Sequence, residues 1–182
     1  MTGKHSGHTS VRANGGGTPM RAGEITIASM LKKMGYATGG FGKWGCGGRG
    51  STGVPEELGF DVFVGYYDQV HAHSYYPPYI IENSKELVLK GNQGGSSGTN
   101  YSHYVIVDRA KQFIRENKDK PFFMMLSPYA VHIPLGAMSA KVDKYTKRAA
   151  ATKRQLPHPV YAAMIEHCDD MVGRIVEAVE KA

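Results

Sequence analysis

The chain has 182 residues and a formal net charge of +6; 41% of its residues are hydrophobic and 21% are charged. These values are ordinary for one globular domain with an apolar core. No apolar run approaches the ~18 residues of a transmembrane helix, which argues against an integral membrane protein, and the charged, Gly-rich start shows no secretory signal. Cys46 and Cys168 lie far apart without a C-x-x-C motif, which argues against a zinc ribbon or a disulfide scaffold.

The positive charge is concentrated in residues 1–54. This segment holds seven Lys and Arg residues against one acidic residue, and 15 of the 23 glycines, whereas residues 55–182 hold fifteen charges of each sign. A basic, Gly-rich segment suits an anion site. Only three aromatic residues that could stack on bases lie in it, so we expect no nucleic-acid partner.

The first third of the chain predicts a loop, a helix, a strand and a second loop. Residues 1–23 have the Gly and Pro content of a flexible loop. Thr26 is a suitable N-cap for a helix over 27–34, where apolar residues recur at helical spacing. A strand is predicted over 36–41, and the glycines of 42–53 indicate a loop.

The middle of the chain continues this alternation. Aromatic and β-branched residues over 60–67 predict a strand, and residues 91–99 predict a flexible surface loop. The next helix is predicted over 101–117, and the unbroken apolar run 122–126 is typical of a strand buried on both faces. The buried face of that helix is expected to hold Ile106, Ala110, Phe113 and Ile114.

The last part of the chain predicts an exposed segment and a long helix. Residues 141–157 are basic and weakly patterned, as in a flexible, exposed excursion. The final helix is expected to carry the ion pairs Asp170–Arg174 and Glu177–Lys181 on its exposed face. Its apolar repeat predicts a buried face of Tyr161, Ile165, Cys168, Val172, Ile175 and Val179.

Alternating helices and strands imply an α/β fold, a sheet covered by helices on both faces. In such folds ligands gather in the loops that follow the strands. Two loops fit that position, one after Phe41 and one after Leu126.

The string Gly45–Gly50 matches G-x-G-x-x-G, the fingerprint of a dinucleotide site. Such a site needs a helix directly after the glycines, and Ser51–Pro55 cannot open one, so we reject that interpretation.

Four residues are candidates for anion or substrate binding. Lys43, set among glycines after a strand, could point its ammonium at an anion or be a solvated surface lysine. His71 and His73 would lie on one side of an extended segment, either as metal ligands or packed on tyrosines. His132, fixed by prolines after a strand, could be a general acid, an anion donor or a buried structural histidine. We interpret His167 and Asp169-Asp170 as structural residues.

Several segments together resemble a known family. Residues 35–44 read G-Y-A-T-G-G-F-G-K-W, similar to the second signature of the type I sulfatases, a family of the alkaline-phosphatase-like superfamily. Residues 1–4 resemble the tail of its first signature, and residues 69–77, 121–134 and the last helix also resemble sulfatase segments. The resemblance covers the chain in order. It implies a single, partial catalytic domain over 1–182 with a mixed, mostly parallel sheet.

The resemblance also implies an activity. Sulfatases hydrolyse sulfate esters, here of a small molecule or a carbohydrate, with a formylglycine nucleophile and a calcium ion. Lys43 and His132 would be the sulfate-contacting catalytic residues, with His73 and His71 as further substrate contacts. Converging cations suit the charge of such a transition state. The family also implies an extracytoplasmic location: periplasmic, secreted or lysosomal.

The chain departs from the family pattern in three ways. Gly45 stands where many members have histidine. No serine or cysteine has the x-Pro-x-Arg context for conversion to formylglycine, and the expected calcium ligands are absent, so we assign no metal ligand. We therefore expect this chain alone to be inactive. Two alternatives stay open: a phosphodiester or phosphonate hydrolase of the same superfamily, and a non-catalytic protein that binds sulfated ligands.

Overall fold

The computed structural model describes residues 1–14, 17–152 and 157–182. The helices of this part are α1 (Ile27–Lys33), α2 (Ser102–Asn117), α3 (Ser139–Ala150) and α4 (Pro159–Glu180), with short 3₁₀ helices η1 (Pro55–Leu58) and η2 (His71–His73). The strands are β1 (Ala37–Lys43), β2 (Val62–Tyr66), β3 (Tyr79–Glu82), β4 (Lys85–Val88) and β5 (Phe122–Ser127). No helix among these residues is long and apolar enough to cross a membrane.

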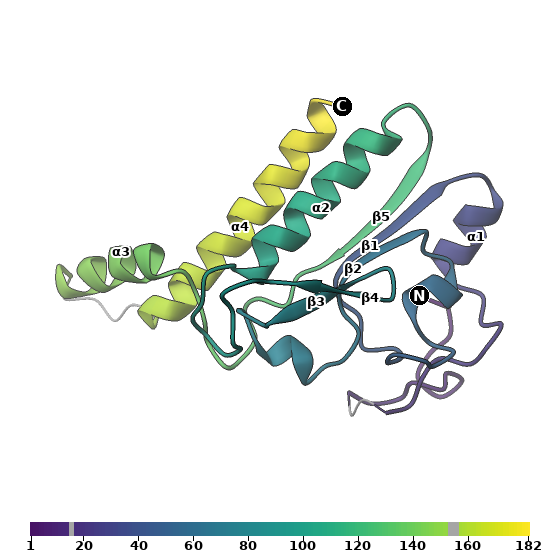
Figure 1. Ribbon diagram of the computed structural model, residues 1–182, viewed down its shortest axis with the longest axis horizontal. Helices are drawn as coiled ribbons and strands as arrows, with labels where there is room; N and C mark the ends of the chain where they lie inside the picture. The colour runs from purple at the N-terminus through teal and green to yellow at the C-terminus, as the bar shows by residue number, and fades with distance from the viewer. Residues whose placement is uncertain (15–16, 153–156) are drawn as a thin grey trace.

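The strands form one mixed sheet in the order β4-β3-β2-β1-β5. Strand β1 pairs in parallel with both β2 and β5, while β3 pairs antiparallel with β2 and with β4. Helices α2 and α4 lie side by side across the sheet (Figure 1). The predicted α/β class is confirmed, with the parallel part of the sheet confined to β2, β1 and β5.

Two glycines of β1 allow aromatic side chains to pack on both faces of the sheet. A Cβ on Gly39 would press against the ring of Phe113 from α2, and a Cβ on Gly40 would press against Phe60 and Phe63. The Phe113 ring belongs to the core beneath α2 and α4, whereas Phe60 and Phe63 pack with Ala28 of α1 on the other face. Helices therefore cover both faces, as the alternating pattern predicted.

Helix α1 begins where the sequence predicted. The Thr26 hydroxyl accepts a hydrogen bond from the Ser29 backbone N–H at 3.0 Å, and the Ser29 hydroxyl accepts one from the Thr26 N–H at 2.9 Å, which is a capping box. The same Thr26 hydroxyl donates to the buried Leu58 carbonyl at 2.6 Å. One side chain thus both starts the helix and ties it to η1.

The predicted loops contain no helix or strand over 1–14, 17–23 and 91–99. The buried Asn92 side chain closes the loop over 91–99. Its amide nitrogen donates to the carbonyls of Pro77 and Asn100, and its amide oxygen accepts from backbone N–H groups of the same segment. One side chain at the start of the loop therefore satisfies backbone groups at its end and the carbonyl of Pro77.

Strand β5 differs from the prediction. Every residue of Phe122–Ser127 is only half-buried, whereas the apolar run predicted a strand buried on both faces. The reason is its place in the sheet: among the described strands, β5 pairs with β1 on one side and has no neighbour on the other. An apolar run shows that a strand is suited to burial, but it does not report the strand's position in the sheet.

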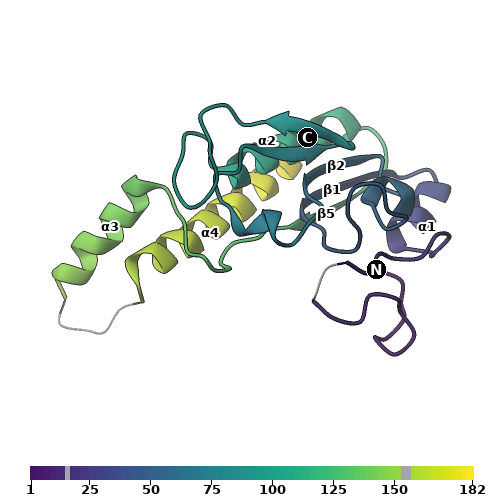
Figure 2. The same cartoon turned by 60° about the horizontal axis from the view of Figure 1, so that its bottom comes forward.

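The segment predicted as an exposed excursion is exposed but largely helical. Residues 139–150 form α3, which has no buried residue and projects away from the sheet (Figure 2). The prediction of a loop over 141–157 is therefore wrong for 141–150, and residues 153–156 lie outside the described part of the chain. The helix is amphipathic enough to form, and it packs mainly against α4.

Helix α4 exists as predicted but buries a different face. Its buried residues are Ala162, Ala163, Met164, His167 and Met171. Most of the predicted face is exposed, namely Tyr161, Ile165, Val172 and Val179, while Cys168 and Ile175 are half-buried. The pattern of large apolar residues was misleading because α4 contacts α2 through small residues, Met and His, with His167 packed on the rings of Tyr101 and Tyr104.

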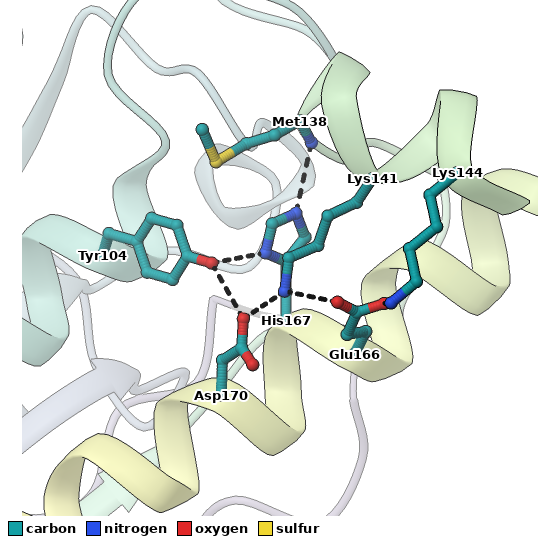
Figure 3. A network of polar contacts seen from close by, with 7 residues as sticks. All are labelled: Tyr104, Met138, Lys141, Lys144, Glu166, His167 and Asp170. Atoms are coloured by element: carbon teal, nitrogen blue, oxygen red, sulfur yellow. Dashed lines mark hydrogen bonds and ion pairs between the residues drawn. The ribbon is translucent and has the colours of Figure 1, made fainter.

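A polar network joins α3 to α4 and α2 (Figure 3). The Lys141 ammonium pairs with Glu166 at 3.2 Å and with Asp170. Asp170 therefore does not pair with Arg174 as predicted; the Arg174 guanidinium lies 4.3 Å from the centre of the Tyr104 ring instead. The other predicted pair, Glu177–Lys181, is present.

His167 is structural, as the sequence indicated. It is fully buried, its Nε2 accepts a hydrogen bond from the Met138 N–H at 3.3 Å, and its Nδ1 lies 2.7 Å from the Tyr104 hydroxyl. Because Nε2 accepts, Nδ1 carries the proton and donates to Tyr104. Burial lowers the pKa of His167 to about 4, so the ring is neutral at physiological pH.

Candidate active site

Three of the predicted site residues lie around one aromatic ring, that of Tyr129. The Lys43 ammonium is 5.7 Å from the ring centre, and the imidazoles of His132 and His73 have centroids 5.3 and 6.1 Å from it. The two imidazoles stack on each other, with centroids 5.1 Å apart. Residues from the ends of β1 and β5 and from η2 thus meet at one edge of the sheet.

Lys43 reaches this place because β1 and β5 approach each other closely. The strand continues through Gly42 to Lys43, two residues beyond the predicted end at 41. Gly42 pairs with Ser127 and has φ +114°, and a Cβ at Gly42 would overlap the Ser127 carbonyl. Only glycine fits this position without strain, and the close pairing places Lys43 beside the loop that follows β5.

The turn that carries His73 is fixed at both ends. The Asp68 carboxylate accepts hydrogen bonds from the backbone N–H groups of Val70 and His71, at 2.7 and 3.0 Å, and starts η2. At its end the buried Tyr66 hydroxyl donates to the Ser74 carbonyl at 2.9 Å. The His73 side chain is left exposed and free to contact His132.

His71 does not join this cluster. The sequence predicted an extended segment with both imidazoles on one side, but residues 71–73 form a 3₁₀ turn, in which side chains two residues apart point in different directions. The His71 ring packs on Tyr66 and Tyr79, with centroids 5.1 and 4.6 Å away. Burial lowers the pKa of His71, and the ring occupies the tyrosine-packed position that was the alternative interpretation.

His132 is held by its backbone, which leaves most of its ring exposed. The Tyr75 hydroxyl donates to the His132 carbonyl at 2.7 Å, and the Tyr129 hydroxyl donates to the Ile133 carbonyl at 2.8 Å. The His132 Nδ1 lies 2.6 Å from the same Ile133 carbonyl, which makes it the protonated nitrogen. Its Nε2 therefore stays available for a ligand.

The cluster has an excess of donors and no anion. Within the described part of the chain, no acidic side chain forms an ion pair with Lys43, whereas Lys4, Lys32, Lys141, Lys144 and Lys181 each pair with a carboxylate. Burial raises the pKa of Tyr129 to about 12, so the central ring remains a neutral phenol. Ammonium and imidazolium groups form charge-assisted hydrogen bonds with anions.

Sequence reasoning missed Tyr129 as the centre of the site. The available signal was its position, since Tyr129 lies three residues after the apolar run 122–126 and close to the predicted site residue His132.

At Gly45, where the family pattern has histidine, φ is +84°, and the Gln69 side chain lies 3.1 Å from where a Cβ would be. The Gln69 amide therefore occupies the space beside Gly45.

The described residues do not supply a metal site. No group of three or more His, Cys, Asp or Glu side chains in 1–14, 17–152 and 157–182 could hold a metal ion. Calcium binds to six to eight oxygen ligands, mostly carboxylates and carbonyls. The residues present do not fit calcium.

A family model described as Sulfatase matches residues 1–182. The chain belongs to the sulfatase family. It is 26% identical over 162 residues to arylsulfatase J of Mus musculus, covering 86% of this chain and 26% of that protein. It is 29% identical over 133 residues to an N-acetylglucosamine-6-O-sulfatase of Bacteroides thetaiotaomicron, covering 72% of this chain and 21% of that protein. The chain thus spans about a quarter of the length of these curated sulfatases.

Solved structures share the fold. The crystal structure of Ps i-CgsB in complex with k-i-k-neocarrahexaose matches with a TM-score of 0.74 and 24% identity, over 92% of this chain and 39% of that one. The structure of BT4656 with its substrate D-glucosamine-2-N,6-O-disulfate matches with a TM-score of 0.63 and 26% identity, over 81% and 26%. The mixed sheet and its helices are therefore those of the sulfatase fold.

Proposed function

We propose that this chain forms the sulfate-contacting part of an enzyme that hydrolyses sulfate esters. The observation that supports this most directly is the gathering of Lys43, His73 and His132 around Tyr129 without an acidic partner among the described residues. A sulfate ester carries its negative charge on oxygen atoms, and the charge shifts toward the leaving oxygen in the transition state. Donors fixed in advance at one place stabilise that charge.

The three side chains have different chemical capacities. The Lys43 ammonium supplies a permanent positive charge that can neutralise the sulfate oxygens. His132 donates its Nδ1 hydrogen to a backbone carbonyl, so a proton bound at Nε2 can pass to the leaving oxygen. His73, stacked on His132, can donate to a further oxygen of the ester. Binding, charge neutralisation and proton donation are what this chain contributes.

Two parts of the family's chemistry stay separate proposals. We propose that the active enzyme uses formylglycine and calcium, as the sulfatase resemblance implies. No Ser or Cys of this sequence has the x-Pro-x-Arg context, and the described residues do not fit calcium. Binding and charge neutralisation by the residues of this chain need neither group, whereas proton donation from His132 accompanies a bond cleavage that needs a nucleophile.

We propose a sulfated carbohydrate as the substrate. Two of the similar proteins are named as acting on sulfated sugars or were solved with one bound. The exposure of His73 and His132 is compatible with a carbohydrate substrate. An extended sugar chain could reach such a surface without entering a closed cavity. We also propose an extracytoplasmic location for the enzyme.

The test is turnover of an aryl sulfate and of a sulfated disaccharide by the active enzyme that contains this chain. Lys43→Ala and His132→Ala should each lower kcat by about 100- to 1,000-fold, as loss of a transition-state donor does. Lys33→Ala removes an exposed lysine at the end of α1 and should change nothing. Undiminished turnover by Lys43→Ala would contradict the proposal, and faster turnover of a phosphate diester or phosphonate than of the sulfate ester would favour the alternative hydrolase.

The chain of 182 residues by itself should bind sulfate without turning over a sulfate ester. Covalent catalysis needs a nucleophile, and a cationic site can only bind and orient. Titration with inorganic sulfate should shift the imidazole NMR signals of His73 and His132. Turnover of an aryl sulfate by the purified chain would show that an unrecognised nucleophile is present.

A further inference from the structure

The His103 side chain is buried beneath the loop that carries His132. His103 lies in the first turn of α2 and is 1% exposed. Its Nε2 is 3.1 Å from the backbone nitrogen of Tyr129 and 3.0 Å from that of Ala130, and it accepts a hydrogen bond from both. One imidazole nitrogen thus holds two consecutive N–H groups of the segment that directly follows β5.

These contacts determine the protonation of the ring. Because Nε2 accepts, the single proton of the neutral imidazole is on Nδ1. Burial lowers the pKa of His103 to about 3, and the nearby His167 adds to this effect, so the acceptor is present throughout the physiological range. The ring also contributes packing, since its centroid lies 5.3 Å from those of Tyr75 and Tyr101.

The arrangement leaves one buried donor of the His103 ring without a partner among the described residues. The His103 Nδ1 is buried and has no hydrogen-bond partner among the described residues. A buried donor left unpaired destabilises a protein. The compensating contacts are the two N–H groups of Tyr129 and Ala130, which would otherwise be unpaired where the chain turns toward His132.

We propose that His103 is a positioning residue of the sulfate site, which it serves by fixing the backbone of Tyr129 and Ala130. The inference rests on the proposed function. Tyr129 provides the ring around which Lys43, His73 and His132 gather, and His132 follows two residues after Ala130. A shift of this backbone therefore moves the central ring and one of the sulfate donors together. A misplacement of about 1 Å can cost about 100-fold in rate.

Two variants of His103 separate the acceptor from the packing. In His103→Leu the two N–H groups lose their acceptor, whereas in His103→Gln the side-chain carbonyl oxygen can accept from both. His167→Leu is the matched control, because His167 is equally buried and also accepts a backbone N–H, but from Met138 at the start of α3 (Figure 3). The measurements are kcat and KM of the active enzyme together with Tm.

We expect His103→Leu to lower kcat by about 10- to 100-fold with a smaller change in KM, and His103→Gln to recover much of that loss. His167→Leu should lower Tm while leaving kcat within about twofold of the parent. If His103→Leu and His167→Leu lower Tm alike and neither changes kcat, then His103 is only structural and the inference is wrong.

A second readout does not depend on activity or on the variants folding. In the parent chain, ¹⁵N NMR should show His103 with a protonated Nδ1 and an unprotonated Nε2, and the amides of Tyr129 and Ala130 should exchange slowly. A protonated Nε2 or fast exchange of both amides would overturn the positioning role even if Lys43→Ala abolishes turnover. Conversely, if Lys43→Ala retains turnover, the proposed function fails while these NMR signals still report on His103.

Discussion

The imidazole of His132 stacks on that of His73, with centroids 5.1 Å apart and planes inclined by 16°. The two histidines come from separate segments, one from the loop after β5 and the other from η2. Each ring therefore limits the orientation of the other, and an anion that binds one of them lies close to both.

This contact predicts that the two histidines act as a unit. In the active enzyme, the losses in kcat/KM from His73→Ala and His132→Ala should not add, because either substitution frees the remaining ring to move. A coupling energy of about 0.5–3 kcal/mol is expected for residues in contact. Lys33→Ala combined with His132→Ala should be additive. If the losses in kcat/KM from the two histidine variants add, the stacking does not affect turnover.

The close approach of β1 to β5 predicts a strong effect at Gly42. Gly42→Ala places a Cβ against the Ser127 carbonyl at a backbone φ of +114°. The backbone must shift, and we expect a loss of about 2–4 kcal/mol in the free energy of unfolding. Gly48→Ala is the control, since a Cβ there meets nothing within 4 Å. Urea unfolding of both variants measures the difference, and equal stability would contradict the described register.

The buried histidines predict how stability depends on pH. Burial lowers the pKa of His103 to about 3 and that of His167 to about 4, whereas both titrate near 6.5 in the unfolded chain. As the pH falls below 6.5, the unfolded chain takes up protons that the folded chain does not. Each histidine then lowers the free energy of unfolding by about 1.4 kcal/mol per pH unit, until the pH reaches its folded pKa.

The variant His167→Gln tests this dependence, because glutamine can still accept the Met138 N–H but cannot titrate. Between pH 6.5 and 4.5 its free energy of unfolding should fall less steeply than that of the parent, by about 1.4 kcal/mol per pH unit. Above pH 7 the two slopes should coincide. Urea unfolding at four or five pH values gives both slopes, and identical slopes at low pH would mean that His167 is not held neutral in the fold.

The exposed apolar face of α4 predicts self-association of the purified chain. Five large side chains on this face are 36% to 53% exposed: Tyr161, Ile165, Val172, Val176 and Val179. Exposed apolar stripes of this kind bind other surfaces. Ile165→Lys combined with Val172→Lys should lower the average mass in sedimentation velocity at high protein concentration, whereas Gln112→Lys on α2 should not. A parent chain that stays monomeric would contradict the prediction.

The order of helices and strands could be predicted because it rests on local signals. The Thr26 cap, the apolar run that became β5 and the apolar stripe of α2 each act within a few residues. The same holds for Lys43 and His132, since one ends β1 and the other follows β5. The carboxyl ends of parallel strands meet at one edge of the sheet. The family resemblance connected these positions before their distances were known.

The missed features depend on contacts between distant segments. His71 turned away from the site because the Asp68 carboxylate favours a 3₁₀ turn over an extended segment. Helix α4 buries its Ala and Met side because α2 packs there. His103 has no motif; the available signal was a histidine on the apolar face of a helix, where burial demands hydrogen-bond partners.

The pairing of β1 with both β2 and β5 also has a kinetic consequence. Ala37 pairs with Phe122, so the contact closes a large loop that includes β2, β3, β4 and α2. The entropy lost in closing this loop is recovered only after β5 has paired, and folds dominated by such distant pairings fold slowly. The β1–β2 pairing and the hairpin of β3 and β4 can form earlier. We therefore expect Lys43 to meet Tyr129 late in folding, so that the anion site forms only when the sheet is complete.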